Sequence, residues 1–237
     1  MTDFDRILIA GFSKKNIEMI QAIKLPIFLT FTIVWGQEKF VTNGLNSEKS
    51  IIIRNYHNNG KLKEEGKKIG TTKIGLWTYW NEDGRKYITE NYIDGKRDGL
   101  QISWHSNGQV STENQFKKGL KDGFFTAWYD NGNKKQTGQF VNGLKDGMMS
   151  YWYDTGGLWM QEYYSMGKKH GLVTGWYKNG QKSIEQNWKN NKKDGSHIMW
   201  YGNGIKKEEG LMRDGKEISK WFFFKENGDL DRMIDHD

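Results

Sequence analysis

Residues 99–122 read GLQISWHSNGQVSTENQFKKGLKD, and residues 123–146 read GFFTAWYDNGNKKQTGQFVNGLKD. The two segments share glycine at position 1, tryptophan at position 6, a second glycine at position 10 and Gly-Leu-Lys-Asp at the end. An internal repeat of this length indicates a protein built from stacked copies of one small unit. The register continues without a gap through rows 51–74, 75–98, 99–122, 123–146, 147–170, 171–194, 195–218 and 219–237.

Two columns of the repeat are almost invariant. Position 6 is aromatic in every row and consists of Tyr56, Trp80, Trp104, Trp128, Trp152, Trp176, Trp200 and Phe224. Position 10 is glycine in every row and consists of Gly60, Gly84, Gly108, Gly132, Gly156, Gly180, Gly204 and Gly228. An aromatic residue and a glycine in fixed phase over eight rows indicate one structural unit that recurs eight times.

Each row has the pattern of two short strands. Residues 76–80 (LWTYW) alternate between two faces, as in a β-strand. An Asn-Gly or Asp-Gly pair at positions 9 and 10 then predicts a two-residue hairpin, because both residues tolerate positive φ. A second strand such as 110–116 follows, and a second turn such as 119–123 closes the row.

The predicted fold class is all-β. A single hairpin cannot bury its own face, whereas stacked hairpins can. We therefore expect about eight 24-residue hairpins in an elongated solenoid or coiled single sheet, with about 10 Å per repeat. Positions 2 and 6 are predicted to form its thin core, in which the Trp column shares a face with Leu76, Leu100, Phe124, Met148 and Leu172.

The composition agrees with thin, turn-rich β structure. Only 35% of the 237 residues are hydrophobic, yet 12 Phe, 11 Tyr and 11 Trp are far too many aromatic residues for a disordered chain. The absence of Cys excludes disulfides, thiolate zinc sites and cysteine nucleophiles. The net charge of +7 permits a polyanionic partner without requiring one.

The repeat resembles the MORN repeat, and more closely its bacterial variant. The pattern Gly, Trp, Gly, Tyr or Phe, Gly is clearest in rows 99–122, 123–146 and 171–194 and looser in rows 51–74 and 219–237. Chains built wholly from this variant are similar to the YwqK-type antitoxin family. The resemblance implies an antitoxin-like binding protein whose partner is a toxin. MORN repeats are also associated with membrane surfaces and with protein scaffolding.

The first fifty residues differ from the repeats. Residues 25–35 (LPIFLTFTIVW) are apolar but too short for a membrane-spanning helix, which needs about 20 residues. We expect residues 1–36 to contain a signal peptide that begins at Met19 and ends at Gly36, followed by a polar lead-in over 37–50. The protein is then exported to the periplasm, envelope or medium; without that signal it is cytoplasmic.

The sequence offers no catalytic or metal-binding motif. Asp98, Asp122, Asp146 and Asp194 share position 24, but neighbours about 10 Å apart cannot share a cation, so we interpret them as turn-capping residues. No His pair has metal-ligand spacing, and no nucleophile or phosphate-loop motif occurs. We therefore expect a protein that is not an enzyme and has no cofactor and no metal.

Two columns are candidate binding sites. The Tyr column at position 7 is a candidate surface for a protein partner and consists of Tyr129, Tyr153, Tyr177 and Tyr201. The basic column at position 23 is a candidate site for anionic lipid or glycan and consists of Arg97, Lys121, Lys145, Lys169 and Lys193. Simpler explanations are cross-strand packing for the tyrosines and solvated turns for the basic residues.

These observations predict a non-catalytic repeat scaffold that binds a protein partner. The alternatives are an envelope or membrane-surface module that binds anionic lipid or glycan through the basic column, and a passive structural protein. A nucleic-acid partner is disfavoured, because 19 carboxylates are interspersed among the 27 basic residues of the segment 51–218.

Overall fold

A computed structural model describes residues 49–236 of the protein. The predicted signal peptide and most of the polar lead-in lie outside the described residues. The eight rows belong to one compact unit, Ser47–Asp237. Every regular element among the described residues is a β-strand, which confirms the all-β prediction.

The strands come in pairs that follow the 24-residue rows. They are β1 (Ile51–Tyr56), β2 (Leu62–Ile69), β3 (Thr72–Trp80), β4 (Lys86–Ile93), β5 (Lys96–Arg97), β6 (Gly99–Trp104), β7 (Val110–Lys117), β8 (Leu120–Trp128), β9 (Lys134–Val141), β10 (Leu144–Lys145), β11 (Gly147–Trp152), β12 (Leu158–Ser165), β13 (Lys168–Trp176), β14 (Lys182–Lys189), β15 (Lys192–Trp200), β16 (Lys206–Arg213), β17 (Lys216–Phe224) and β18 (Leu230–Asp235).

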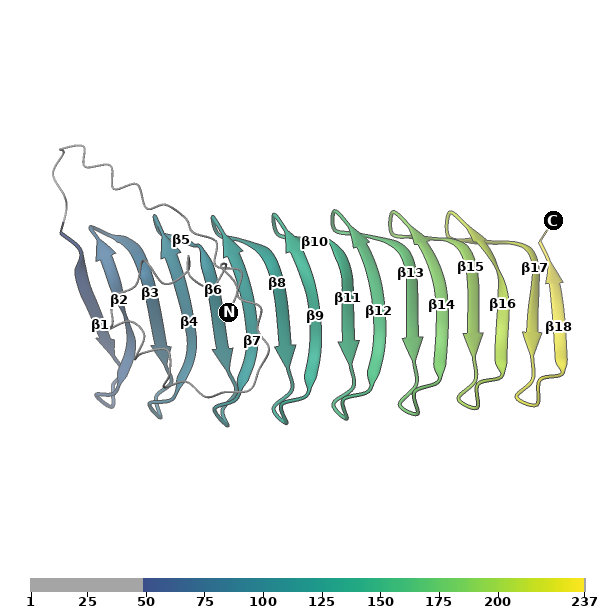
Figure 1. Ribbon diagram of the computed structural model, residues 1–237, viewed down its shortest axis with the longest axis horizontal. Helices are drawn as coiled ribbons and strands as arrows, with labels where there is room; N and C mark the ends of the chain where they lie inside the picture. Colours follow the sequence, from purple (N-terminus) through teal and green to yellow (C-terminus); the bar gives the residue numbers. More distant parts are fainter. Residues whose placement is uncertain (1–48, 237) are drawn as a thin grey trace, which may run out of the picture. The chain divides into compact units, whose positions relative to one another are not determined.

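All 18 strands form one antiparallel sheet in which neighbours in sequence are neighbours in space. The pairs β5/β6 and β10/β11 each correspond to one continuous strand of the other rows, interrupted for one residue at Asp98 or Asp146. Figure 1 shows the strands lying across the length of the sheet, with β1 at one end and β18 at the other. Of the two predicted architectures, the single open sheet is therefore the observed one.

The two turns of each row differ from the prediction. At positions 9 and 10 the loop has three residues. In row 75–98, Asn81 N donates to Arg85 O, Gly84 N donates to Asn81 O, and only Gly84 has positive φ (87°). The two-residue turn lies at positions 20 and 21 instead. In rows 75–98 to 195–218 both residues have positive φ, as in Asp94 (48°) and Gly95 (73°), which is the type I′ geometry that matches strand twist.

The buried face of the sheet is the opposite of the predicted one. Position 3, not position 2, carries the most buried side chains: Trp77 and Met149 are 0% exposed and Trp221 is 2% exposed. Position 16 of the neighbouring strand lies beside it, and Glu90, Asn114, Glu162 and Gln186 are buried there. We call this side, with positions 3, 5, 16, 18 and 23, the packed face.

A second period of three repeats is visible in the packed face. Position 16 is glycine at Gly66, Gly138 and Gly210, which are 72 residues apart. A Cβ at these three positions would overlap Trp77, Met149 and Trp221 respectively, each from the following row. The bulky side chain therefore lies directly on the glycine backbone, and this large-on-small pairing recurs every third repeat.

Side chains at the turns connect each row to the next. Tyr129, Tyr153, Tyr177 and Tyr201 each donate a hydrogen bond from the phenol to the position 6 carbonyl of the following row, at 2.7–2.9 Å. Position 9 asparagines do the same to the position 8 carbonyl, as Asn131 does to Asp154. These bonds explain why the position 7 and position 9 residue types recur.

The carboxylates of position 24 cap turns, as expected, but in the following row. Asp98 accepts a hydrogen bond from Lys118 N at 2.9 Å, and Asp122 accepts one from Asn142 N at 3.1 Å. Each donor residue has positive φ and begins a type I′ turn. The aspartates therefore stabilise the tightest turns of the sheet.

Candidate binding surfaces

The Tyr column is largely used inside the protein. Its four rings are half-buried, and each phenol is hydrogen-bonded to the next row. Cross-repeat bonding accounts for the column, and recognition of a partner by these tyrosines stays a prediction.

The basic column lies half-buried on the packed face rather than along an exposed edge. Position 23 pairs with the aromatic residue at position 18, and the cations lie over aromatic rings. Arg97 Cζ is 4.5 Å from the Phe116 centroid, and Lys121 Nζ is 4.9 Å from that of Phe125. Burial, and to a lesser degree the charge of Arg97, lowers the pKa of Lys121. Such cation–π contacts stabilise a partly desolvated cation.

Two related polar clusters hold parts of this column in place. In the first, Glu90 accepts hydrogen bonds from Tyr92 and from Gln101, both at 2.5 Å, and Arg97 Nη1 lies 3.6 Å from the same carboxylate. Burial and the hydrogen bond to Glu90 raise the pKa of Tyr92. The charge of Glu90 is thus compensated within the packed face.

The second cluster lies 72 residues further along the chain. Glu162 accepts hydrogen bonds from Tyr164 at 2.9 Å and Tyr151 at 3.2 Å, and Lys169 Nζ lies 2.5 Å from its other oxygen. Burial acts to raise the pKa of Glu162, but hydrogen bonds from Lys169 and Tyr164 outweigh it and lower that pKa. Burial and the charge of Glu162 raise the pKa of Tyr151 to about 12. Both clusters are internally satisfied, as structural networks are.

The opposite side of the sheet carries a continuous row of exposed apolar side chains. These position 2 residues are between 42% and 68% exposed. We call this row the apolar stripe: Ile52, Leu76, Leu100, Phe124, Met148 and Leu172. In the last two rows position 2 is Ser196 and Lys220, so the stripe stops after six rows. The column that was predicted to share the core with the Trp column is therefore a surface feature, while the Trp column itself is half-buried.

The face around the apolar stripe is almost free of charge. Positions 4, 15 and 17 share this face with position 2, because they lie opposite one another in the strand pairs. In rows 75–98 to 147–170 these four positions comprise sixteen residues with one charge, Glu113, in a protein that is 27% charged. Depletion of charge is the compositional mark of the centre of a protein–protein interface.

Three equivalent hollows open on this face, each beside one of the position 16 glycines. The hollow at Gly66 has a volume of about 260 Å³ and lies between Ile52 and Leu76. The hollow at Gly138, of about 380 Å³, lies between Phe124 and Met148. Because the glycines are 72 residues apart, the hollows recur every third repeat, about 30 Å apart.

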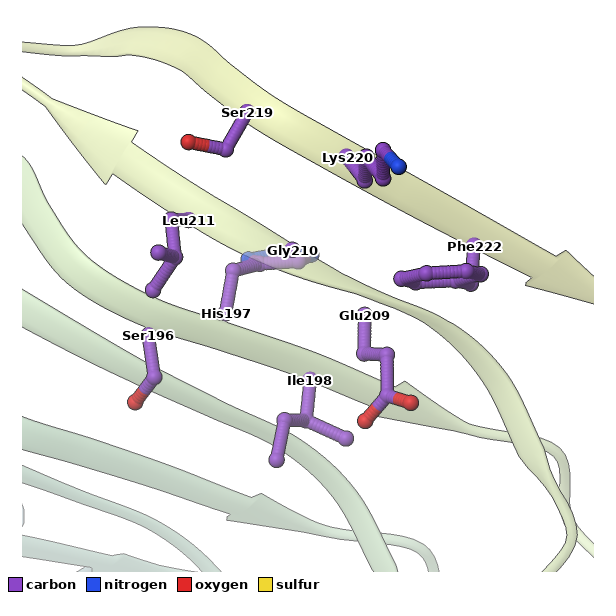
Figure 2. A pocket seen from close by; sticks show the side chains of 9 residues that line it. All are labelled: Ser196, His197, Ile198, Glu209, Gly210, Leu211, Ser219, Lys220 and Phe222. Carbon is purple, nitrogen blue, oxygen red and sulfur yellow. The ribbon is translucent and has the colours of Figure 1, made fainter. Parts of the chain in front are cut away.

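Figure 2 shows the third hollow, at Gly210, formed by β15, β16 and β17. Its volume is about 480 Å³, and Ile198, Leu211 and Phe222 give it an apolar lining. Ser196 and Lys220 replace the flanking apolar residues of the other two hollows. The third hollow therefore lies outside the apolar stripe, and the Gly66 hollow also has charged residues in its lining, Glu65 and Lys67.

Within residues 49–236, no group of three or more His, Asp or Glu side chains is arranged to hold a metal ion. The same part of the chain has no helix of the length and hydropathy that crossing a membrane requires. The absence of catalytic activity stays a prediction.

The sequence contained a signal that identifies the exposed face. Position 18, which is mostly aromatic, and position 23, which is basic, lie opposite each other in a strand pair and so share a face. Where position 16 is glycine, position 3 of the next row carries a large side chain. These pairings assign positions 3 and 5 of the first strand to the packed face and position 2 to the opposite, exposed face.

Three segments of the chain, residues 51–67, 97–118 and 169–190, match the family model of the MORN repeat variant. The match confirms the resemblance to the MORN repeat variant at these three segments, and the last two segments are 72 residues apart, in step with the second period. No curated protein matches the chain significantly. The narrower resemblance to YwqK-type antitoxins stays a prediction.

Proposed function

We propose that this protein is a non-catalytic scaffold of MORN-type repeats that binds a protein partner through the face that carries the apolar stripe. The observation that carries the proposal is the contrast between the two faces. The packed face satisfies its charges internally, whereas the stripe face presents six large apolar side chains, and in its four middle rows the only charge among them is Glu113. An exposed apolar patch of this size is typical of interaction sites.

The proposal moves the interface from the Tyr column to the apolar stripe. The tyrosines already donate hydrogen bonds to the next repeat, whereas the stripe side chains present 42% or more of their surface to solvent. Large apolar side chains that lose this exposure supply most of the affinity of a protein interface. More specifically, the YwqK-type resemblance implies that this protein partner is toxin-like.

The test is affinity purification of the tagged full chain from its own cells at about 0.5 M salt, where charge-driven contacts are screened. We expect one protein, either a different chain or an untagged copy of this chain, to co-purify in stoichiometric amount. Phe124→Lys should abolish its recovery, because it places a charge in the centre of the stripe.

Ser196→Lys is the matched control, since it introduces the same side chain at the same repeat position outside the stripe. Lys220 already occupies position 2 in the last row, so lysine is compatible with this strand position. A partner recovered equally with the wild type and with Phe124→Lys would contradict the proposed interface.

Binding of anionic lipid or glycan through the basic column stays the alternative. Lys121, Lys145 and Lys169 lie over aromatic rings, so a surface ligand would have to draw them from those contacts. Replacement of the three by Gln, followed by sedimentation with anionic vesicles at low salt, tests it; unchanged sedimentation counts against the alternative.

A further inference from the structure

We infer that the apolar stripe binds the stripe of a second copy of this chain, so that two sheets pack face to face with their long axes antiparallel. The inference rests on the proposed function, because it names the partner of the same surface. The charge, the area and the period of the stripe face each favour a second copy.

Charge favours contact between two copies on this face only. The protein carries a net charge of +7, so two copies repel each other in general. The four stripe-face positions in rows 75–98 to 147–170 hold only Glu113 as a charged residue. Contact through these four rows therefore removes one carboxylate per copy from water, and the charged residues of the two end rows on this face, Arg54, Glu65, Lys67 and Glu185, lie toward the ends of the contact.

The area of the stripe face matches a stable interface. The six stripe side chains are separated by five intervals of about 10 Å and so span about 50 Å, and four to five strand residues give a width of about 15 Å. Their product, about 750 Å² on each copy, equals the roughly 800 Å² per partner of a standard protein interface. Sheets with aligned strands pack face to face in this way, about 10 Å apart.

The regular spacing of the stripe side chains favours a second copy over a partner that has no repeats. A partner must present side chains at the same spacing of about 10 Å, which a second copy does by construction. A two-fold axis parallel to the strands, with an offset of half a repeat, places Leu76 of each copy in the Gly138 hollow of the other. The same operation places Met148 in the Gly66 hollow and brings the two Leu100 side chains beside the axis.

The first experiment measures the mass of the full chain in solution by light scattering at increasing concentration. We expect a doubling from the monomer mass of 27.7 kDa. Phe124→Lys should return the mass to that of the monomer, whereas Ser196→Lys should leave it doubled. Circular dichroism of both variants establishes that each is folded.

The second experiment uses the absence of Cys from the chain. Leu100→Cys should be joined to a second copy by a short bis-maleimide, because the two side chains face each other across about 10 Å. Lys220→Cys, at the same repeat position but beyond the end of the stripe, should yield no cross-linked dimer.

A monomeric wild type that is not cross-linked at Leu100→Cys overturns the inference. A dimer that persists in Phe124→Lys, or that is cross-linked equally at Lys220→Cys, overturns it as well, since the contact then lies elsewhere. Neither result touches the proposed function, which fails if no protein co-purifies with the wild type or if Phe124→Lys retains the co-purified partner. Doubled mass together with cross-linking confined to Leu100→Cys supports the inference.

Discussion

At the scale of single residues, the packed face depends on carboxylates that are buried and yet ionised. Glu162 keeps its charge because Lys169 and Tyr164 hydrogen-bond to it, and the net result is a lowered pKa. Such a group stabilises the fold above its unfolded pKa, which is about 4.3. That contribution is lost as the pH falls through the lower pKa of the folded state.

We therefore expect Glu162→Gln to lower the melting temperature at pH 7 and to lower it less at about pH 3. The wild type loses the Glu162 contribution below about pH 4, so the difference between the two proteins should shrink on acidification. Thermal unfolding followed by circular dichroism between pH 7 and pH 3 measures it. Glu226→Gln, at an exposed turn, is the control, and a constant difference for Glu162→Gln across this range would contradict the account.

At the scale of the elements, the glycines of position 16 set how closely a strand approaches the ring above it. Gly66→Ala places a methyl group within the rigid indole of Trp77 and should cost about 3 kcal/mol. Gly138→Ala meets the flexible Met149 and should cost about 1 kcal/mol. Chemical denaturation measures both.

Gly202→Ala is the matched control for these substitutions. A Cβ there has no atom within 4 Å, and the residue lies outside the left-handed region, so the change should stay within about 0.5 kcal/mol. Equal effects at Gly66 and Gly202 would show that backbone entropy, rather than the ring, explains the cost.

The sequence predicts the strands, their length and their antiparallel order, because alternation and turn residues are local properties. Alternation alone does not predict which face packs, because a single-layer sheet has apolar residues on both. Position 2 is apolar in the first six rows and position 3 contains Gln101 and His197, yet position 3 is the buried one, since those polar groups bond within the face. The three-residue loop was not predicted either, because an Asn-Gly pair is compatible with two-residue and three-residue loops, and the pairing of the strands decides between them.

At the scale of the whole molecule, the 72-residue period predicts which deletions are tolerated. Deletion of 147–218 removes three rows and places Trp221 on Gly138, as it now lies on Gly210. Deletion of 171–218 removes only two rows but places Trp221 against Glu162 and its hydrogen-bonded tyrosines. Stability in repeat proteins is set by such nearest-neighbour contacts.

We expect the three-row deletion to have the higher melting temperature of the two, although it lacks 24 more residues. Thermal unfolding of the two proteins side by side decides this. The reverse order would mean that the number of repeats, rather than the match between neighbours, controls stability.

The orientation of the strands across the length of the sheet has a mechanical consequence. The backbone hydrogen bonds that join the strands point along the long axis, so tension applied between β1 and β18 loads each strand pair in turn rather than all of them together. The hydrogen bonds of a strand pair pulled in this direction break one after another. Each 24-residue hairpin that is released adds about 70 Å, the extended length of the row less its folded spacing of about 10 Å. The sheet would yield under small forces in equal steps and lengthen several-fold before it is fully unfolded.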